Sequence, residues 1–342
     1  MRIVYKAMLA LAALATFSGS ASAQRSGLSQ EGFESYLPQL GAEAQRQGVR
    51  RSTLDSILPT LQFSARTIQL DQAQPGGTSG GSAVPAFAPY RARHVSPALI
   101  AKGRDRYAAG LTQLGAIRRR YGVTPSILVA IWGHETSYGA VTGDFDLLNS
   151  LASLAYEGRR RKLFTDEFVA TLKMLERGYS RGQLKGSWAG ATGYPQFLPS
   201  VFLRLAVDGD GDGRANIWSS QADALASIAN YLSNAGWKPG IPWGVAVSVP
   251  AGFDRSAIPT RLTSPRCPRV HERHSRWMSA GEWRRLGVAS SLPDREQASL
   301  LEPDGPGRTA YLLTTNYRTI LDYNCSNFYA LSVGLLADAV AR

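Results

Sequence analysis

The chain has 342 residues, enough for a buried core and one or two domains, and this length excludes a peptide or a disulfide-dependent mini-protein. Hydrophobic residues make up 44% and charged residues 19%, a balance that excludes a disordered chain. The 38 lysines and arginines exceed the 26 acidic residues. The resulting net charge of +12 favours an anionic partner: nucleic acid, a membrane surface or a cell-wall polymer.

The N-terminus is typical of a secretory signal peptide. Arg2 and Lys6 precede an apolar run over residues 7–17, and small residues follow up to Ala23, where cleavage is expected. The run is too short to span a bilayer, and no later stretch approaches the roughly 20 apolar residues of a membrane helix. There is no cysteine at the cleavage point itself, where a lipid anchor of the bacterial lipoprotein kind would need one. We therefore expect an exported chain without a stable membrane anchor, for which nucleic acid is a poor partner.

Composition and periodicity divide the rest of the chain. Helical spacing predicts short helices in residues 24–71, and abundant glycine, proline and serine predict a loop over residues 72–89. Helical patterns return in residues 90–239 and 316–342, whereas alternating valines and recurrent prolines predict a small β-containing subdomain over residues 240–315. The sequence thus predicts a mainly α protein of the α+β class.

The first residue that points to chemistry is Glu135. It follows Leu128 by seven positions and Ile131 by four, which places its carboxylate on the apolar face of a helix. Desolvation there would raise its pKa toward values useful for a general acid. The position alone is equally compatible with a glutamate satisfied by an arginine or by the backbone. The adjacent His134 cannot share that face, and we expect it to be a structural or rim residue and not a base.

The second motif is a stretch rich in glycine and alanine, residues 186–200, which also contains Trp188, Tyr194 and Phe197. Small residues allow close backbone approach, and flat aromatic faces can stack on sugar rings. Ser187 and Gln196 lie among them and add polar groups. The stretch therefore indicates the wall of a cleft, although a buried glycine-rich helix junction would explain the small residues.

The third motif is an acidic loop in which Asp208, Asp210 and Asp212 alternate with glycine. It matches the first half of a calcium loop of the EF-hand type. The twelfth place is Ser219 instead of glutamate, and the next acid is Asp223. An Asx-turn without metal would also explain the pattern. Three carboxylates this close repel one another without a cation, so we expect Ca²⁺.

The two cysteines, Cys267 and Cys325, are predicted to form one disulfide, because export exposes them to an oxidising compartment. Two unpaired buried thiols are the alternative.

Together these motifs resemble, in order and spacing, the lytic murein transglycosylase B family, glycoside hydrolase family 103 of the lysozyme-like superfamily. The resemblance covers residues 88–340 and is most specific over residues 121–237. It implies a lysozyme-like catalytic core formed by residues 90–239 and 316–342, a periplasmic location, and peptidoglycan glycan strands as the partner. It names no protein partner.

The resemblance also implies roles for individual residues. Glu135 is the single catalytic acid and base, and Ser187 orients it. Gln196 and Asn324 hold the sugar. The further saccharide contacts implied are Tyr90, Tyr231 and Tyr323, and the implied metal ligands are Asp208, Asp210, Asp212, the Arg214 carbonyl and Asp223.

The implied reaction needs one carboxylate, whereas glycosidases generally need two. Glu135 would protonate the glycosidic oxygen between N-acetylmuramic acid and N-acetylglucosamine, and would then deprotonate the muramyl C6 hydroxyl, which gives a 1,6-anhydro end. Asp144 or Asp146 could instead supply a second carboxylate, as in a hydrolytic muramidase of the lysozyme type. A non-catalytic peptidoglycan-binding protein is the other alternative. The basic run at residues 159–162 receives no role.

Overall fold

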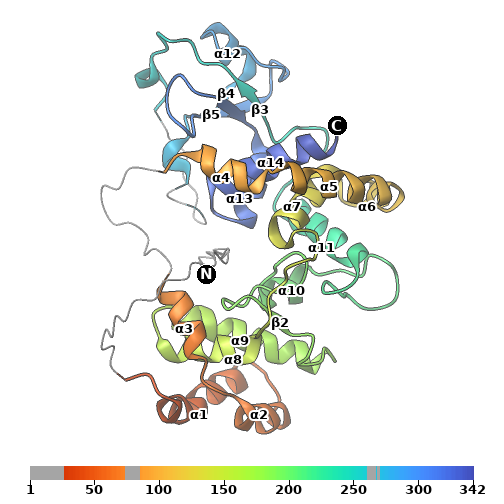
Figure 1. The fold of residues 1–342 in the computed structure, drawn as a ribbon, viewed down its shortest axis with the longest axis vertical. Coiled ribbons are helices and arrows are strands. Elements are labelled where there is room, and N and C mark those ends of the chain that lie inside the picture. The colour runs from red at the N-terminus through yellow and green to blue at the C-terminus, as the bar shows by residue number, and fades with distance from the viewer. Residues whose placement is uncertain (1–26, 74–84, 260–266, 268–269) are drawn as a thin grey trace.

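The computed structural model describes residues 27–73, 85–259, 267 and 270–342, so the predicted signal peptide lies outside the described residues. Helices dominate the described part, together with one four-stranded and one two-stranded antiparallel sheet. The prediction of a mainly α protein with a small β part is therefore confirmed. Figure 1 shows two stacked groups of helices, with the larger sheet at one end of the molecule. None of the described helices is both long enough and apolar enough to cross a membrane.

The lower group in Figure 1 joins the N-terminal helices to the middle of the chain. Phe33 and Leu40 are buried in one apolar cluster with Leu151 and Phe168, so the N-terminal helices share a core with the helices that follow Glu135. This group contains α1 (Gln30–Arg46), α2 (Arg51–Ile57), a 3₁₀ turn (Leu58–Thr60), α3 (Ala65–Gln72), β1 (Phe145–Asp146), α8 (Leu147–Glu157), α9 (Arg161–Glu176), β2 (Lys185–Gly186) and α10 (Pro199–Leu205).

The upper group is built around α7, every residue of which is buried. Its apolar cluster includes Leu128 and Ile131 of α7 together with Leu331 and Leu336 of the C-terminal helix. The helices of this group are α4 (Phe87–His94), α5 (Pro97–Ala109), α6 (Leu111–Tyr121), α7 (Pro125–Thr136), α11 (Gln221–Asn234), α13 (Thr315–Tyr323) and α14 (Asn327–Val340).

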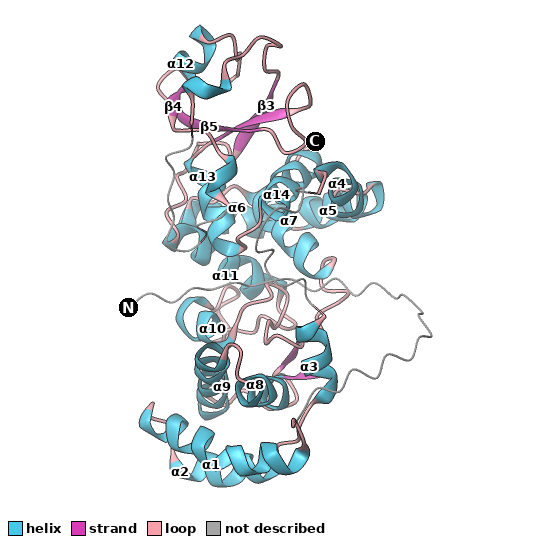
Figure 2. Cartoon of the chain, turned by 90° about the vertical axis from the view of Figure 1, so that its left-hand side faces the viewer, coloured by secondary structure: helices cyan, strands magenta, loops and turns pink. Residues whose placement is uncertain are grey.

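The larger sheet, drawn in magenta at the upper end of Figure 2, has the strand order β3-β6-β5-β4. Val245 pairs with Leu312, and Leu300 pairs with Leu312 from the other side. Trp283 of α12 is fully buried against this sheet, where its Nε1 donates to the Ala298 carbonyl of β5 at 3.0 Å. The elements are β3 (Gly244–Val247), two 3₁₀ turns (Arg255–Ala257 and His271–Arg273), β4 (Met278–Ser279), α12 (Ala280–Arg285), β5 (Gln297–Leu301) and β6 (Ala310–Leu313).

Of the loop predicted over residues 72–89, residues 74–84 lie outside the described residues, and α4 begins inside the predicted range, at Phe87. Pro89 lies in the first turn of this helix, where its missing N–H costs no intrahelical hydrogen bond. The Phe87 amide donates to Asp304 Oδ1 at 2.5 Å and so ties the start of α4 to the β subdomain.

Candidate active site

Glu135 lies near the C-terminal end of α7 and is only 8% exposed. Burial raises the pKa of its carboxyl group to about 8, although a hydrogen bond from Tyr329 acts in the opposite direction. The Oε2 atom has no hydrogen-bond partner among the described residues. Glu135 is therefore largely protonated at neutral pH, as a general acid must be.

Tyr329 of α14 is the residue that sequence reasoning missed. Its hydroxyl donates to Glu135 Oε1 at 2.6 Å across 194 positions of sequence, and both side chains are buried. No local spacing connects two residues so far apart, and only the packing of α14 beside α7 brings them together. A buried hydroxyl donor stabilises the carboxylate that forms when Glu135 gives up its proton.

The turn after Glu135 holds an unusual backbone conformation. Ser137 and Tyr138 are non-glycine residues with φ of 49° and 61°. Such left-handed residues cost about 1–2 kcal/mol each and persist only where surrounding contacts enforce them. Two contacts from α5 do so: the Tyr138 hydroxyl donates to the Leu99 carbonyl at 3.0 Å, and Lys102 Nζ donates to the Ser137 carbonyl at 2.8 Å. The C-terminal end of α7 is thereby held against α5.

Ser187 and Gln196 lie on the predicted wall, but their side chains mainly organise that wall. Ser187 Oγ accepts from the Ala191 amide at 3.0 Å. Gln196 Nε2 donates to the carbonyls of Thr142 and Gly193 at 3.1 and 2.9 Å. The expected orientation of Glu135 by Ser187 is not the arrangement of this structure, because Tyr329 makes the hydrogen bond to Glu135 and Ser187 closes its own turn.

The predicted tyrosines surround this wall and Glu135. The Tyr323 hydroxyl donates to the Pro195 carbonyl at 2.6 Å, and its ring lies 4.7 Å from that of Tyr231. On the α4 side, burial and then the charge of Glu135 raise the pKa of Tyr90 to about 12. Burial first, and then the same charge, also raise the pKa of Tyr323. Both rings therefore lie near the Glu135 carboxyl. Asn324 is buried at the end of α13, directly after Tyr323.

His134 packs within this group as a neutral imidazole. Its ring centroid lies 4.9 Å from that of His94 and 4.5 Å from that of Tyr329. Burial lowers the pKa of His134 to about 3, so it places no positive charge beside Glu135. This agrees with the structural role expected for it.

The other acids considered for catalysis have structural partners or lie at the surface. Asp146 Oδ1 caps α8 by accepting from the Asn149 amide at 2.9 Å, and Oδ2 pairs with Arg181 Nε at 2.7 Å. Asp144 is exposed. Glu167, which the sequence analysis did not single out, is buried on α9, where it accepts from the amide and hydroxyl of Ser200 at 2.9 and 2.7 Å and so holds the start of α10.

The acidic loop has the donor set of a calcium site. Carboxylate oxygens of Asp208, Asp210 and Asp212 lie within 4.8 Å of one another, and hard oxygen ligands of this kind suit Ca²⁺. Asp223 differs from the expectation that it is a ligand. Its Oδ1 accepts from the Gly209 amide at 2.8 Å, and its Oδ2 accepts from the Asn216 amide at 2.6 Å. This buried carboxylate braces the loop from within.

The predicted disulfide is present. Cys267 is bonded to Cys325, across a sequence separation of 58. Cys325 directly follows Asn324, so the bond ties the segment after α13 to the β subdomain.

Cys267→Ala is expected to lower the free energy of unfolding by about 4 kcal/mol, because the bond closes a long loop in the unfolded chain. It should also weaken glycan binding, because the segment that carries Tyr323 and Asn324 gains freedom. Chemical denaturation and glycan titration measure the two effects. Unchanged stability, or two reactive thiols in the unfolded, unreduced wild type, would contradict the prediction.

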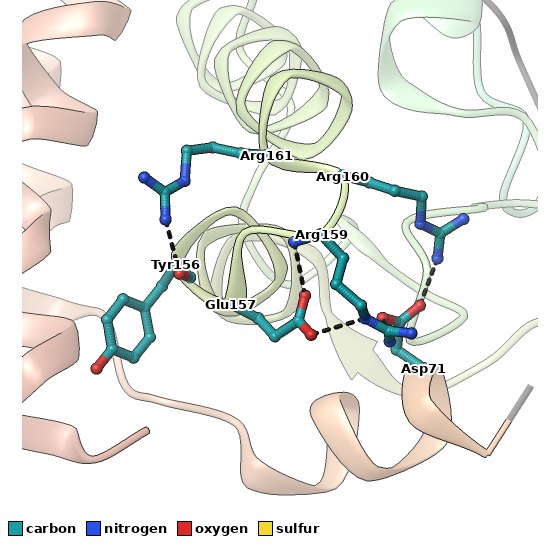
Figure 3. Close-up of polar contacts among 6 residues, drawn as sticks. All are labelled: Asp71, Tyr156, Glu157, Arg159, Arg160 and Arg161. Carbon is teal, nitrogen blue, oxygen red and sulfur yellow. Dashed lines mark hydrogen bonds and ion pairs between the residues drawn. The ribbon is translucent and has the colours of Figure 1, made fainter. Parts of the chain in front are cut away.

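Two arginines of the basic run at residues 159–162 form an internal clamp, drawn in Figure 3. Arg159 and Arg160 both pair with Asp71, a residue of α3 that is only 2% exposed. Arg159 also pairs with Glu157 at 2.7 Å. These arginines attach α3 to the turn between α8 and α9, and their charges are compensated within the protein.

Comparisons with known proteins agree with this arrangement. The model of the Transglycosylase SLT domain family matches residues 32–338. Membrane-bound lytic murein transglycosylase B of Escherichia coli (strain K12) is 33% identical over 278 residues, which are 78% of this chain and 69% of that protein.

Solved structures are similar over most of the chain. SltB3 from Pseudomonas aeruginosa, in complex with NAG-anhNAM-pentapeptide, is 38% identical with a TM-score of 0.79, over 90% of this chain and 79% of that one. The Escherichia coli lytic transglycosylase Slt35, in complex with calcium, is 30% identical with a TM-score of 0.71, over 91% of this chain and 93% of that one. The family match spans both helical groups and the β subdomain, and the chain therefore belongs to the Transglycosylase SLT domain family and is a lytic transglycosylase.

Proposed function

We propose that this protein is a periplasmic lytic transglycosylase that cleaves the β-1,4 bond between N-acetylmuramic acid and N-acetylglucosamine in peptidoglycan and leaves 1,6-anhydro-muramyl ends. The observation that carries this proposal is the buried Glu135 carboxyl, with a pKa raised to about 8 and a hydrogen bond from Tyr329. The similar SltB3 was solved with a NAG-anhNAM-pentapeptide, a molecule that contains the anhydro sugar.

One carboxyl group can serve both halves of this reaction. Protonated Glu135 gives its proton to the glycosidic oxygen as the C1–O bond breaks. The resulting carboxylate, stabilised by the Tyr329 hydroxyl, then takes the proton of the muramyl C6 hydroxyl as O6 bonds to C1. Glu135 ends protonated, and no water is consumed. A raised pKa suits both steps, because the buried acid is protonated at the start and its conjugate base is strong.

We infer that Ser187, Gln196, Asn324, Tyr90, Tyr231 and Tyr323 contact the glycan. The positions of the three tyrosines around Glu135 and the predicted wall support this inference. Tyr90 and Tyr323 lie near Glu135, Tyr231 packs on Tyr323, and the Tyr323 hydroxyl holds the wall through Pro195.

Hydrolysis by two carboxylates is the alternative chemistry, and the partners of Asp146 argue against it. A general base that activates water needs a free carboxylate, whereas both Asp146 oxygens are bound to an amide and an arginine. The test is digestion of purified sacculi followed by mass spectrometry. We expect anhydro-muramyl ends, which lack one water relative to reducing ends. A majority of reducing ends would support hydrolysis, and uncut glycan would support a non-catalytic binding protein.

We further propose that Asp208, Asp210, Asp212 and the Arg214 carbonyl hold Ca²⁺, whose role would be to neutralise the acidic loop. Calcium should then raise the melting temperature, because a ligand that binds only the folded state stabilises it. Asp210→Ala should remove the response. Asp105→Ala, which removes an exposed acid outside the loop, serves as the control. Thermal melts with and without millimolar calcium measure the effect, and no shift in the wild type would favour the turn without metal.

A further inference from the structure

Helices α4, α5 and α6 concentrate positive charge that the proposed chemistry does not use. Residues 87–121, here called the basic helical segment, contain eight cationic residues and one acid, Asp105, which gives 8 − 1 = +7 of the chain's net +12. All of the cations except Lys102 are exposed. They are Arg91, Arg93, Lys102, Arg104, Arg106, Arg118, Arg119 and Arg120. In Figure 1 these helices, in orange and gold, follow one another beside α7 and α14.

The cations of this segment differ from those of the lower helical group in their partners. In the lower group Arg46, Arg50 and Arg51 pair with acids, as do Arg159 and Arg160. Within the described part of the chain, no cation of the basic helical segment forms an ion pair.

The contacts that these cations do make are with uncharged groups. Arg104 donates to the Ala339 carbonyl at 3.0 Å, and Arg106 lies 5.6 Å from the centroid of the Trp132 ring. Charge of one sign without internal compensation repels itself and attracts anions from solution. The segment is therefore an electrostatic surface that is available to an external polyanion.

The position of the basic helical segment indicates which polyanion it would bind. Tyr90 of α4 stacks on His94 at 3.8 Å and lies near Glu135, while Lys102 of α5 holds the turn that follows Glu135. The segment thus begins beside the catalytic group. A polymer network with one strand at Glu135 would present its neighbouring carboxylates, those of its peptides included, to these helices.

We propose that the basic helical segment is an accessory surface that binds carboxylates of the wall polymer next to the strand being cut and retains the enzyme on the sacculus between cuts. This rests on the proposed function for the identity of the polymer. The expected consequence is binding that is sensitive to salt, because exposed charges are screened by ions.

The test compares two triple variants in the Glu135→Gln background, in which cleavage cannot disturb binding. Arg118, Arg119 and Arg120 change to Gln in one variant. Arg46, Arg50 and Arg51 change to Gln in the matched control, which removes the same charge from exposed residues of the lower group. In pelleting assays with purified sacculi, we expect about tenfold weaker binding for the α6 variant and less than a twofold change for the control. Equal losses, or no loss in the α6 variant, would overturn the proposal. Circular dichroism melts confirm that both variants fold.

Two further binding experiments identify which anion the basic helical segment binds. Sacculi whose carboxylates have been converted to neutral amides should bind the Glu135→Gln protein about as weakly as untreated sacculi bind the α6 variant. If the α6 substitutions instead abolish pelleting with phosphatidylglycerol vesicles and leave sacculus binding unchanged, the surface serves a membrane and the proposal fails.

A separate assay distinguishes this proposal from the catalytic one. With Glu135 in place, the α6 substitutions should leave kcat/KM for a short soluble glycan unchanged. An enzyme that binds sacculi through α6 but cuts no glycan would refute only the catalytic mechanism.

Discussion

Glu135→Gln is expected to reduce glycan cleavage by about 10³-fold or more while leaving the fold and sacculus binding nearly intact. General acid–base groups contribute about 10²–10⁴-fold to rates, and here one group performs both proton transfers. The amide keeps the size of the side chain and can accept the Tyr329 hydrogen bond, but it cannot give or take the proton. The measurement is the release of soluble muropeptides from sacculi over time.

A second readout of this variant is the dependence of stability on pH. The pKa of Glu135 is raised to about 8 in the folded protein from its ordinary value of 4.5. Because the folded state holds this proton more tightly, the contribution to stability is full below pH 4.5 and is lost as the pH rises toward 8. The melting temperature of the Gln variant should therefore fall less than that of the wild type between pH 5 and pH 8.

Glu167→Gln is the matched control, because burial also raises the pKa of Glu167, to about 7, and Glu167 lies on α9, away from Glu135. Its amide can accept from the Ser200 N–H and donate to the Ser200 hydroxyl, so cleavage should persist. Full activity in Glu135→Gln would refute the mechanism. Equal loss in both variants would show that a buried carboxyl is needed for folding only.

Tyr329→Phe is expected to move the alkaline limb of kcat/KM upward by about one pH unit and to lower kcat by about tenfold to a hundredfold. The hydrogen bond from Tyr329 lowers the pKa of Glu135, so its loss lets that pKa rise. A hydrogen bond to a charged group contributes about 1.5–3 kcal/mol, and 1.36 kcal/mol corresponds to one pKa unit. The carboxylate that forms during the reaction also loses its donor, which slows the step that needs it as a base.

Tyr317→Phe is the control for this change. Tyr317 is buried and donates to the Asn327 carbonyl at 3.1 Å, so its substitution removes a buried hydroxyl without touching Glu135. It should lower the melting temperature and leave the pH profile in place. A Tyr329→Phe profile with an unmoved alkaline limb would show that this hydrogen bond does not tune the acid.

Features built from neighbouring residues were predictable from sequence. The spacing of Glu135 from Leu128 and Ile131 places it on a buried helix face, and the structure confirms its burial. The alternating aspartates at 208–212 converge because they share one short loop. The two cysteines form a disulfide, as expected for an exported chain in an oxidising compartment. In each case the chain between the residues is short, or the choice of partner is unique.

Features that depend on distant partners were decided only by the tertiary structure. Glu135 takes its hydrogen bond from Tyr329 instead of Ser187, and Asp223 bonds backbone amides inside the acidic loop. The basic residues at 159–162 and those at 87–121 also differ in a way that the sequence alone does not reveal. Arg159 and Arg160 both pair with the buried Asp71, whereas no cation of residues 87–121 forms an ion pair with the residues that the structure describes. Sequence determines which charges a helix carries, but whether a charge is compensated depends on what packing places within about 4 Å of it, where electrostatic attraction is strong.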